Sequence, residues 1–259
     1  DRALGRHADA DVWQTRASAA AEAINRLLWD DANGAYVDGL GSRHCAQHST
    51  IFPLAFGLVP EARRARAIAH VRSRSMACSV YGAQHLLDAL YLNRQADAAL
   101  DLMTARHDRG WLRMLEAGST MTLEAWDWRY KNNLDWNHAW ATAPLNVCAR
   151  WILGVRTAAP GGALLSIAPQ PGRLRSAEGR VPTMRGAVEV ALRQVPGVSC
   201  ELELCLPCNT TAEVSLPWTG GAAQAWLDGT PAAAAVADGR IAIRRLASGR
   251  HHVLVRAAG

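Results

Sequence analysis

The sequence of 259 residues is poor in several residue types, and each scarcity narrows what the protein can be. Lysine occurs once, at Lys131, among 28 basic residues, so arginine carries almost all of the positive charge behind the net +5. Such an arginine bias is typical of a GC-rich bacterial genome. The arginines are scattered, acidic residues interrupt them, and no nucleic-acid-recognition motif accompanies them. The charge therefore indicates a solvated surface, and we expect no nucleic-acid partner.

Long apolar runs are missing as well. No stretch approaches the roughly 20 apolar residues of a membrane-spanning helix, so we expect no membrane partner. The opening residues DRALGRHADADVW contain neither an initiating methionine nor the apolar core of a signal peptide. We therefore expect a fragment or a processed chain. Apolar residues still make up 49% of the chain, which is enough for one large core or two ordinary ones.

The cysteines offer no metal or redox centre. Only Cys205 and Cys208, in CLPC, have a motif-like spacing. A thioredoxin-type CxxC stands at a strand-to-helix turn, and a zinc site needs a second pair of ligands. The surrounding VSCELELCLPCNTTAEVSLP instead indicates a strand, a turn and a strand, without a second pair. We expect no metal and no cofactor.

The first part of the chain has a helical period. DVWQTRASAAAEAINRLLWD places Trp13, Ala17, Ala20, Ile24 and Leu28 on one helical stripe. Pairs of predicted helices joined by short loops, with no strands between them, indicate helical hairpins. A solenoid would show a repeat of fixed period, which we do not find. Further helices are predicted over residues 46–59, 60–75, 80–93, 95–107 and 138–155, the last of them kinked at Pro144 or started there.

After residue 157 the period changes to that of strands. Short segments alternate polar and apolar residues and are bounded by Gly, Pro and Asn, as in an antiparallel sandwich. In 198–206, for example, Val198, Cys200, Leu202, Leu204 and Leu206 fall on one face, with Ser199, Glu201, Glu203 and Cys205 on the other. We therefore predict a helical domain over residues 1–157 and a β-sandwich domain over residues 158–259.

Phenylalanine and tyrosine are rare, but four of the ten tryptophans lie within residues 120–144, TMTLEAWDWRYKNNLDWNHAWATAP. Indole planes suit the C–H faces of sugars, and Asp, Asn and His side chains suit their hydroxyls. Glu124 stands among these rings, and partial desolvation there is expected to raise its pKa toward the range useful for proton transfer. The alternative is a tryptophan-rich core junction. Asp135 would then cap the next helix, His138 would be structural and Glu124 would be salt-bridged.

A family resemblance favours the sugar site. GWLRMLEAGSTMTLEAWDWRYKNNLDWNHAWATAPLNVCARWILGV, followed by PGGALLSIAPQPGRL, resembles the α-L-rhamnosidases of glycoside hydrolase family 78. The shared features are a GATT-x-WE-x-W loop, an NHAW-x-x-AP helix start and an I-x-PQ-x-G strand. Their order and spacing match over most of residues 105–175. The resemblance implies an (α/α)6 barrel followed by a β-sandwich, and inverting hydrolysis of terminal α-L-rhamnosides.

The resemblance also implies roles for single residues. Glu124 falls on the general base that activates water, and His138 on a histidine that contacts the sugar or the water. Asn137, beside it, offers a further hydrogen-bonding side chain. Leu123 stands where the family usually has tryptophan, which puts the choice of sugar in question. The residues implied to line the pocket are Trp126 and Trp140, with Tyr81 and Trp111.

The second carboxyl group of the mechanism has no counterpart here. An inverting glycosidase needs a general acid roughly 6.5–9.5 Å from the base, and the family's acidic, arginine-containing stretch that carries it is not found. The predicted helices are also too few to complete the barrel. We expect a partial barrel whose apolar faces meet a missing N-terminal half or a second copy. Candidates for the acid by residue type alone are Asp30, Asp31, Asp38, Asp127 and Asp135.

Three functions remain open at this stage. The first is a rhamnosidase-type hydrolase acting on a rhamnose-containing glycoside or oligosaccharide, with this chain as part of its catalytic domain. The second is an (α/α)6 glycosidase for another sugar, against which L-rhamnose would compete poorly. The third is a carbohydrate-binding remnant, in which binding survives replacement of Glu124 and no turnover occurs.

Overall fold

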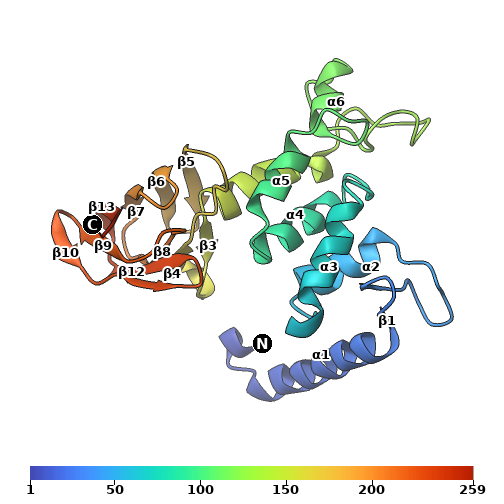
Figure 1. Ribbon diagram of the computed structural model, residues 1–259, viewed down its shortest axis with the longest axis horizontal. Coiled ribbons are helices and arrows are strands. Elements are labelled where there is room, and N and C mark those ends of the chain that lie inside the picture. The colour runs from blue at the N-terminus through green and yellow to red at the C-terminus, as the bar shows by residue number, and fades with distance from the viewer. Residues whose placement is uncertain (259) are drawn as a thin grey trace. The chain divides into compact units, whose positions relative to one another are not determined.

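The computed structural model describes residues 1–258, apart from the side chain of Arg244, and forms two compact units (Figure 1). The first unit is Asp1–Pro144 and the second is Leu145–Gly259. This division precedes the boundary predicted at residue 157. The reason is that the π-helix η3 (Cys148–Ile152) contacts strands β3 (Val155–Thr157) and β5 (Ser176–Thr183).

Helices build the first unit, as predicted. Helix α2 packs against α3 and α4, and α4 packs against α5. In α4, Ala83, Leu86, Leu87 and Leu90 are buried at the i, i+3, i+4, i+7 spacing of one helical face. The elements are η1 (Arg2–Leu4), α1 (His7–Leu27), β1 (Trp29–Asp30), β2 (Ala35–Tyr36), α2 (Gln47–Ala55), α3 (Glu61–Ser73), α4 (Ala83–Leu92), α5 (Ala96–Met103), α6 (Trp111–Glu116) and η2 (Ala139–Ala141).

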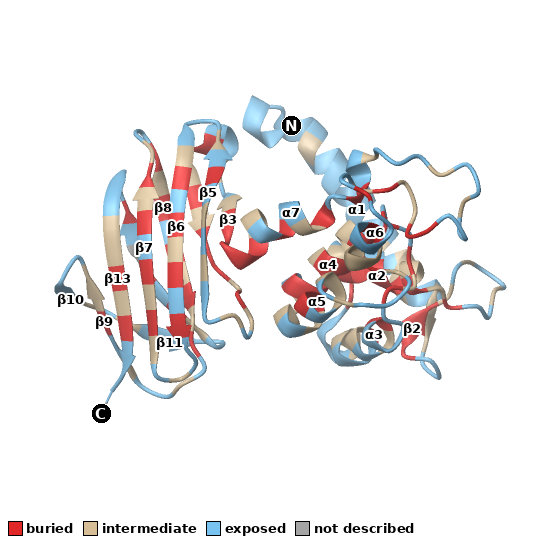
Figure 2. Cartoon of the chain, turned by 90° about the horizontal axis from the view of Figure 1, so that it is seen from above, coloured by how far each residue is buried: buried red, intermediate tan, exposed pale blue. Residues whose placement is uncertain are grey.

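The apolar stripe of α1 is exposed, although its period predicts burial. No residue of this helix is buried, as the colouring of α1 in Figure 2 shows. Trp13 is 58% exposed. Only its C-terminal end is tied down. There the side-chain amide of Asn25 donates to the carbonyl of Leu58 at 2.8 Å and accepts from the Tyr36 hydroxyl at 2.6 Å. Most of the stripe is therefore left uncovered by the described part of the chain, while Ile24 and Leu28 at its C-terminal end are half-buried.

The last helix predicted within residues 138–155 does not begin at His138 but near Pro144, which is one of the two forms expected for it. The structure has η2, then α7 (Ala143–Val147), then the π-helix η3. His138 has an extended backbone that pairs with Thr122, which prevents a helix from beginning there. Pro144 lies in the first turn of α7, where the missing N–H costs nothing.

The second unit is a β-sandwich of two sheets. The order in the larger sheet is β10-β9-β13-β7-β6-β5, and in the smaller sheet it is β11-β12-β8-β4-β3. Neighbouring strands are antiparallel except β4 and β8, which are parallel. The strands not yet given are β4 (Leu164–Ile167), β6 (Gly186–Val195), β7 (Ser199–Leu206), β8 (Thr211–Pro217), β9 (Ala223–Leu227), β10 (Thr230–Ala232), β11 (Ala235–Ala237), β12 (Arg240–Leu246) and β13 (Gly249–Ala257).

One apolar core joins the two sheets. It includes Val190 and Leu202 from the larger sheet and Val214 and Ile241 from the smaller one. The face predicted for 198–206 is confirmed within β7, where alternate residues from Cys200 to Leu206 are buried. Figure 2 shows the same alternation along β6, β7 and β13. This period of two is what a sandwich with one solvated face per sheet requires.

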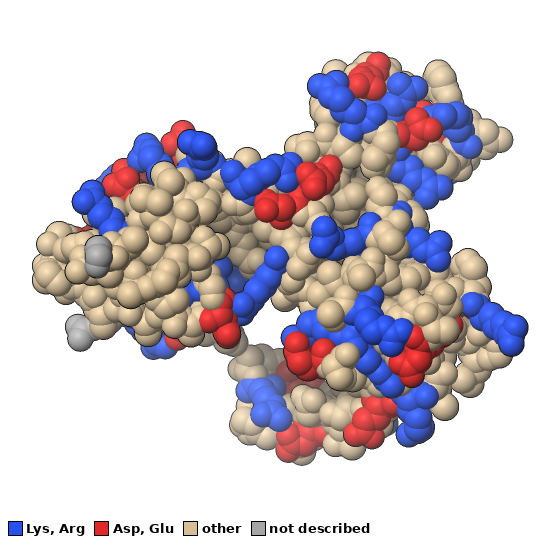
Figure 3. Space-filling view, viewed as in Figure 1, with Lys and Arg blue, Asp and Glu red and all other residues tan. Residues whose placement is uncertain are grey.

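The surface carries mixed charge. On the face shown in Figure 3, basic side chains lie among acidic ones rather than in one large patch of a single sign. Arg64 pairs with Glu61, and Arg66 pairs with Asp31 at 3.2 Å. In residues 1–258, no helix combines the length and the apolar character needed to cross a bilayer.

Candidate functional site

The tryptophan-rich segment is a long loop between α6 and α7 whose ends pair with each other. The amide of Glu124 donates to the carbonyl of Asp135 at 3.0 Å, and the amide of His138 donates to the carbonyl of Thr122 at 2.9 Å. The Thr122 hydroxyl returns a bond to the His138 carbonyl at 2.6 Å. These bonds bring Glu124, Asp135 and His138 together, as the sequence interpretation requires.

The carboxylate of Glu124 accepts hydrogen bonds on both oxygens. The Lys131 ammonium donates to Oε1, and the Asp135 amide donates to Oε2 at 3.3 Å. The Lys131 hydrogen bond is the main cause that holds the pKa of Glu124 below its usual range, and the Asp135 amide and the positive charge of Lys131 add to it. The expected rise of this pKa is therefore wrong, because the donors outweigh the desolvation. Glu124 is held as an anion.

Three partly exposed aromatic rings, two of them on the loop of Glu124, lie next to one another. The His138 ring lies 4.1 Å from the Trp140 ring, and Trp140 lies 5.6 Å from Tyr81. Trp140 is 48% exposed and Tyr81 is 59% exposed. The His138 Nδ1 atom lies 3.6 Å from an Asp135 carboxylate oxygen. His138, Trp140 and Tyr81 thus form one open aromatic surface. His138 belongs to the same loop as Glu124.

Two other predicted pocket residues lie elsewhere. Trp126 is only 3% exposed, and its indole N–H donates to the carbonyl of Cys78 at 2.7 Å. Trp111 packs edge-on against it at 4.9 Å and donates to the carbonyl of Ala141. Trp126 is therefore a core residue that anchors the loop, in contrast to the expected pocket-lining role. Nothing in the sequence separates it from Trp140, because both tryptophans follow an alanine within the same polar, tryptophan-rich segment.

Leu123 also points into the core. It is 2% exposed, and its amide faces the Met114 sulfur at 3.5 Å. The difference from the family's usual tryptophan at this position therefore alters packing beneath the loop. It does not remove a ring from the open aromatic surface, so Leu123 gives no reason to question the sugar.

The polar residues of DWNHAW behave differently from the helix-cap alternative. Asn137 is exposed, and its backbone N–H donates to the Asp135 carboxylate at 3.4 Å. The helical turn η2 begins after His138 with no side-chain cap, so Asp135 is not an N-cap. Asp135 instead closes the loop onto Glu124 through its backbone. Its side chain and that of Asn137 stay available at the surface.

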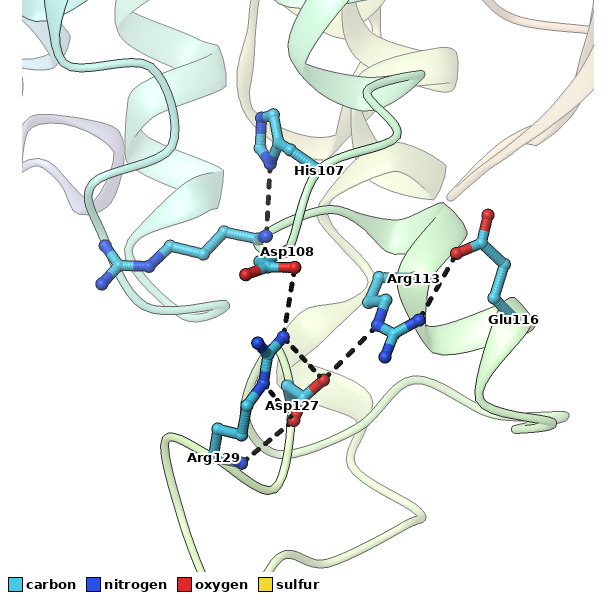
Figure 4. A network of polar contacts seen from close by, with 7 residues as sticks. His107, Asp108, Arg113, Glu116, Asp127 and Arg129 are labelled. Atoms are coloured by element: carbon cyan, nitrogen blue, oxygen red, sulfur yellow. Dashed lines mark hydrogen bonds and ion pairs between the residues drawn. The ribbon is translucent and has the colours of Figure 1, made fainter.

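An ionic network that the sequence did not predict braces the loop (Figure 4). The buried Asp127 accepts from the Arg129 guanidinium at 3.1 Å and from Arg113 at 3.4 Å. Arg129 also pairs with Asp108 at 3.1 Å. The network joins the loop to α6 and to the segment before it. Lys131, the partner of Glu124, was missed too, although its being the only lysine in the chain was a usable signal.

Three of the five candidates for a general acid are poorly suited to that role. A general acid must keep its proton near neutral pH, which requires a raised pKa. Hydrogen bonds instead lower the pKa of Asp127, chiefly from Arg129, of Asp30, chiefly from Asn33, and of Asp38, chiefly from His44. These three aspartates are therefore anions at neutral pH.

Comparison with known families decides what kind of chain carries this loop. Residues 1–152 match the bacterial α-L-rhamnosidase 6 hairpin glycosidase domain, and residues 154–225 match the bacterial α-L-rhamnosidase C-terminal domain. The chain belongs to the bacterial α-L-rhamnosidase family. Its helical hairpins and β-sandwich are the two domains of that family. A search of the curated proteins found no match.

Solved rhamnosidase structures share the fold of this rhamnosidase-family chain. The α-L-rhamnosidase from Dictyoglumus thermophilum superposes with a TM-score of 0.84 at 21% identity, over 98% of this chain and 30% of that one. The Streptomyces avermitilis enzyme, solved in complex with L-rhamnose, gives 0.68 at 24% identity, over 85% and 22%. The family 78 rhamnosidase of Bacillus sp. GL1 gives 0.64 at 26% identity, over 84% and 25%. This chain thus spans less than a third of each relative.

Proposed function

We propose that this chain is part of an enzyme that hydrolyses terminal α-L-rhamnosides with inversion, and that Glu124 activates the attacking water. The observation that supports it is the anionic Glu124 carboxylate, held by Lys131 in the loop that leads through His138 to an open aromatic surface. A base must be ionised to take a proton, and rings with hydroxyl-binding neighbours suit a sugar. Trp140, Tyr81, Asn137 and His138 are the proposed sugar contacts.

The general acid is proposed to lie outside the described residues. Lowered pKa values at Asp30, Asp38 and Asp127 support this. The exposed stripe of α1 supports a related proposal. Either the remaining hairpins of the six-hairpin domain or a second copy of the chain would cover that stripe.

The direct test is hydrolysis of an aryl α-L-rhamnoside with a strongly activated leaving group. Such a group departs without protonation, so the reaction does not need the acid. We expect turnover whose first product, followed by NMR, is β-L-rhamnose. An α-anomeric first product would rule out inversion. A folded chain that binds L-rhamnose without turnover would favour the binding remnant, and stronger competition by another monosaccharide would favour a glycosidase for that sugar.

Lys131 sets the pH range in which the proposed base works. Replacing Lys131 with methionine removes both the donor and the charge that lower the pKa of Glu124, so that pKa rises. A base with a raised pKa becomes protonated at a higher pH. The acidic limb of the profile of kcat/KM against pH should therefore shift to higher pH. The charge-conserving Lys131→Arg variant should leave the limb near its original position. An unmoved limb in both variants would show that Lys131 does not act on the base.

A further inference from the structure

A pocket lies beside the loop that carries Glu124. It has a volume of about 330 Å³ and is lined by the end of α3, the segment before α6 and Tyr130 of the loop. The residue after Tyr130 is Lys131, the partner of Glu124. One loop therefore contributes side chains to both places. The polar and aromatic residues of the pocket are Arg74, Ser75, His107, Asp108, Arg109 and Tyr130.

Two guanidinium groups in this pocket lack a carboxylate partner among the described residues. Arg74 has a carbonyl oxygen, that of Cys45, at 3.5 Å. Arg109 lies 4.8 Å from the centre of the Tyr130 ring. The acidic residue of the pocket, Asp108, is engaged by Arg129 at 3.1 Å. The pocket therefore has an excess of positive charge on planar groups, which bind carboxylates in a two-pronged manner.

The remaining pocket groups suit a sugar ring. The Arg109 guanidinium covers one face of the Tyr130 ring, and the ring, still 46% exposed, leaves apolar surface for a ligand. His107 accepts the Arg109 amide on Nδ1 at 3.2 Å, so in the neutral ring the proton is on Nε2, 3.4 Å from the Ser75 hydroxyl. The Ser75 hydroxyl and the free lone pairs of Asp108 can meet sugar hydroxyls. The pocket thus combines positively charged arginines with the Tyr130 ring, and a sugar that carries a carboxylate suits both.

The ionic network described above holds this pocket in shape. Arg129 joins Asp127 of the loop to Asp108 of the pocket wall, and Asp127 is braced in turn by Arg113 (Figure 4). Because Asp127 is buried, these bonds fix the loop against the wall before any ligand arrives. A preformed pocket whose two arginines lack a carboxylate partner is suited to bind an anion without reorganising.

We infer that Arg74 and Arg109 bind the carboxylate of a uronic acid in the substrate, while the terminal rhamnose lies at Glu124. The inference rests on the proposed function, because it names the acidic sugar that accompanies the rhamnose. The guanidinium groups hold the carboxylate, and Tyr130 lies against the uronate ring. The enzyme then prefers acidic rhamnosyl oligosaccharides over neutral ones.

Calorimetry with non-hydrolysable ligands tests this preference independently of turnover. The unmodified chain is titrated with a thio-linked α-L-rhamnosyl glucuronide and with its neutral glucose counterpart. We expect the acidic ligand to bind about tenfold more tightly at low salt, and the preference to shrink as salt screens the arginines. Arg74→Gln and Arg109→Gln should each reduce the preference and leave the affinity for the neutral ligand unchanged. Arg106→Gln, an exposed arginine near the pocket, is the matched control and should change neither.

The contrary outcomes are distinct. Equal affinity for the two ligands, or a preference that survives loss of both arginines, would overturn the uronate site and leave the proposed function standing. Inorganic sulfate binding as tightly as the acidic ligand would overturn it as well, because the pocket would then hold any anion. Failure of both ligands to bind would overturn the proposed function and this inference together.

Discussion

Replacement of Glu124 by glutamine is expected to lower kcat/KM on an activated α-L-rhamnoside by about 10²- to 10⁴-fold, the usual contribution of a general base. The amide keeps the shape of the side chain and can still accept the Lys131 hydrogen bond. It cannot take a proton from water, so the loss falls on the chemical step. Steady-state kinetics of the two proteins, with their folding compared by circular dichroism, measures the effect.

Two further measurements separate a base from a structural carboxylate. Azide needs no deprotonation to attack the anomeric carbon, so it should restore turnover in the Glu124→Gln variant and release a β-rhamnosyl azide. The matched control is Glu116→Gln at the end of α6, where the glutamate pairs with Arg106 and Arg113, and its rate should be unchanged. Wild-type turnover by the Glu124→Gln protein would exclude Glu124 as the base.

Two tryptophans of the same loop should differ in what they contribute. Trp126→Ala should mainly lower stability, and Trp140→Ala should mainly weaken sugar binding. Trp126→Ala is expected to cost about 3–5 kcal/mol of unfolding free energy, as for other buried tryptophans. It would empty a buried site and leave the Cys78 carbonyl without its donor. Trp140→Ala should cost less, about 1 kcal/mol, because its ring is half exposed. Urea denaturation monitored by circular dichroism measures both values.

Binding of L-rhamnose should depend more on Trp140 than on Trp126. Covering about 50 Å² of the Trp140 ring with a sugar gains roughly 1.3 kcal/mol, so Trp140→Ala is expected to weaken L-rhamnose binding about tenfold. Calorimetric titration with L-rhamnose measures this. A stable Trp126→Ala protein with weakened binding would return Trp126 to the pocket. Unchanged binding by Trp140→Ala would remove the open aromatic surface from the sugar site.

Much of the candidate site was predictable because its residues lie close together in the sequence, within one loop whose ends pair with each other. Glu124, Asp135 and His138 stand within a short segment, and their types indicate proton transfer and hydroxyl binding. The partnership with Lys131 was not predictable from period or propensity. It depends on where a flexible side chain points once the loop has closed. The same holds for the pKa of Glu124, which the donors lower against the effect of desolvation.

The two periods of hydrophobicity determined by themselves that helical hairpins precede a β-sandwich, because burial of one face imposes a period of 3.6 on a helix and 2 on a strand. They also determined the buried face of β7. Which apolar faces find partners was decided only by the tertiary structure, as the exposed stripe of α1 shows. The division of the loop into a buried Trp126 and an open Trp140 was decided there too. Both depend on contacts between segments distant in sequence, and those contacts exist only after the chain has packed.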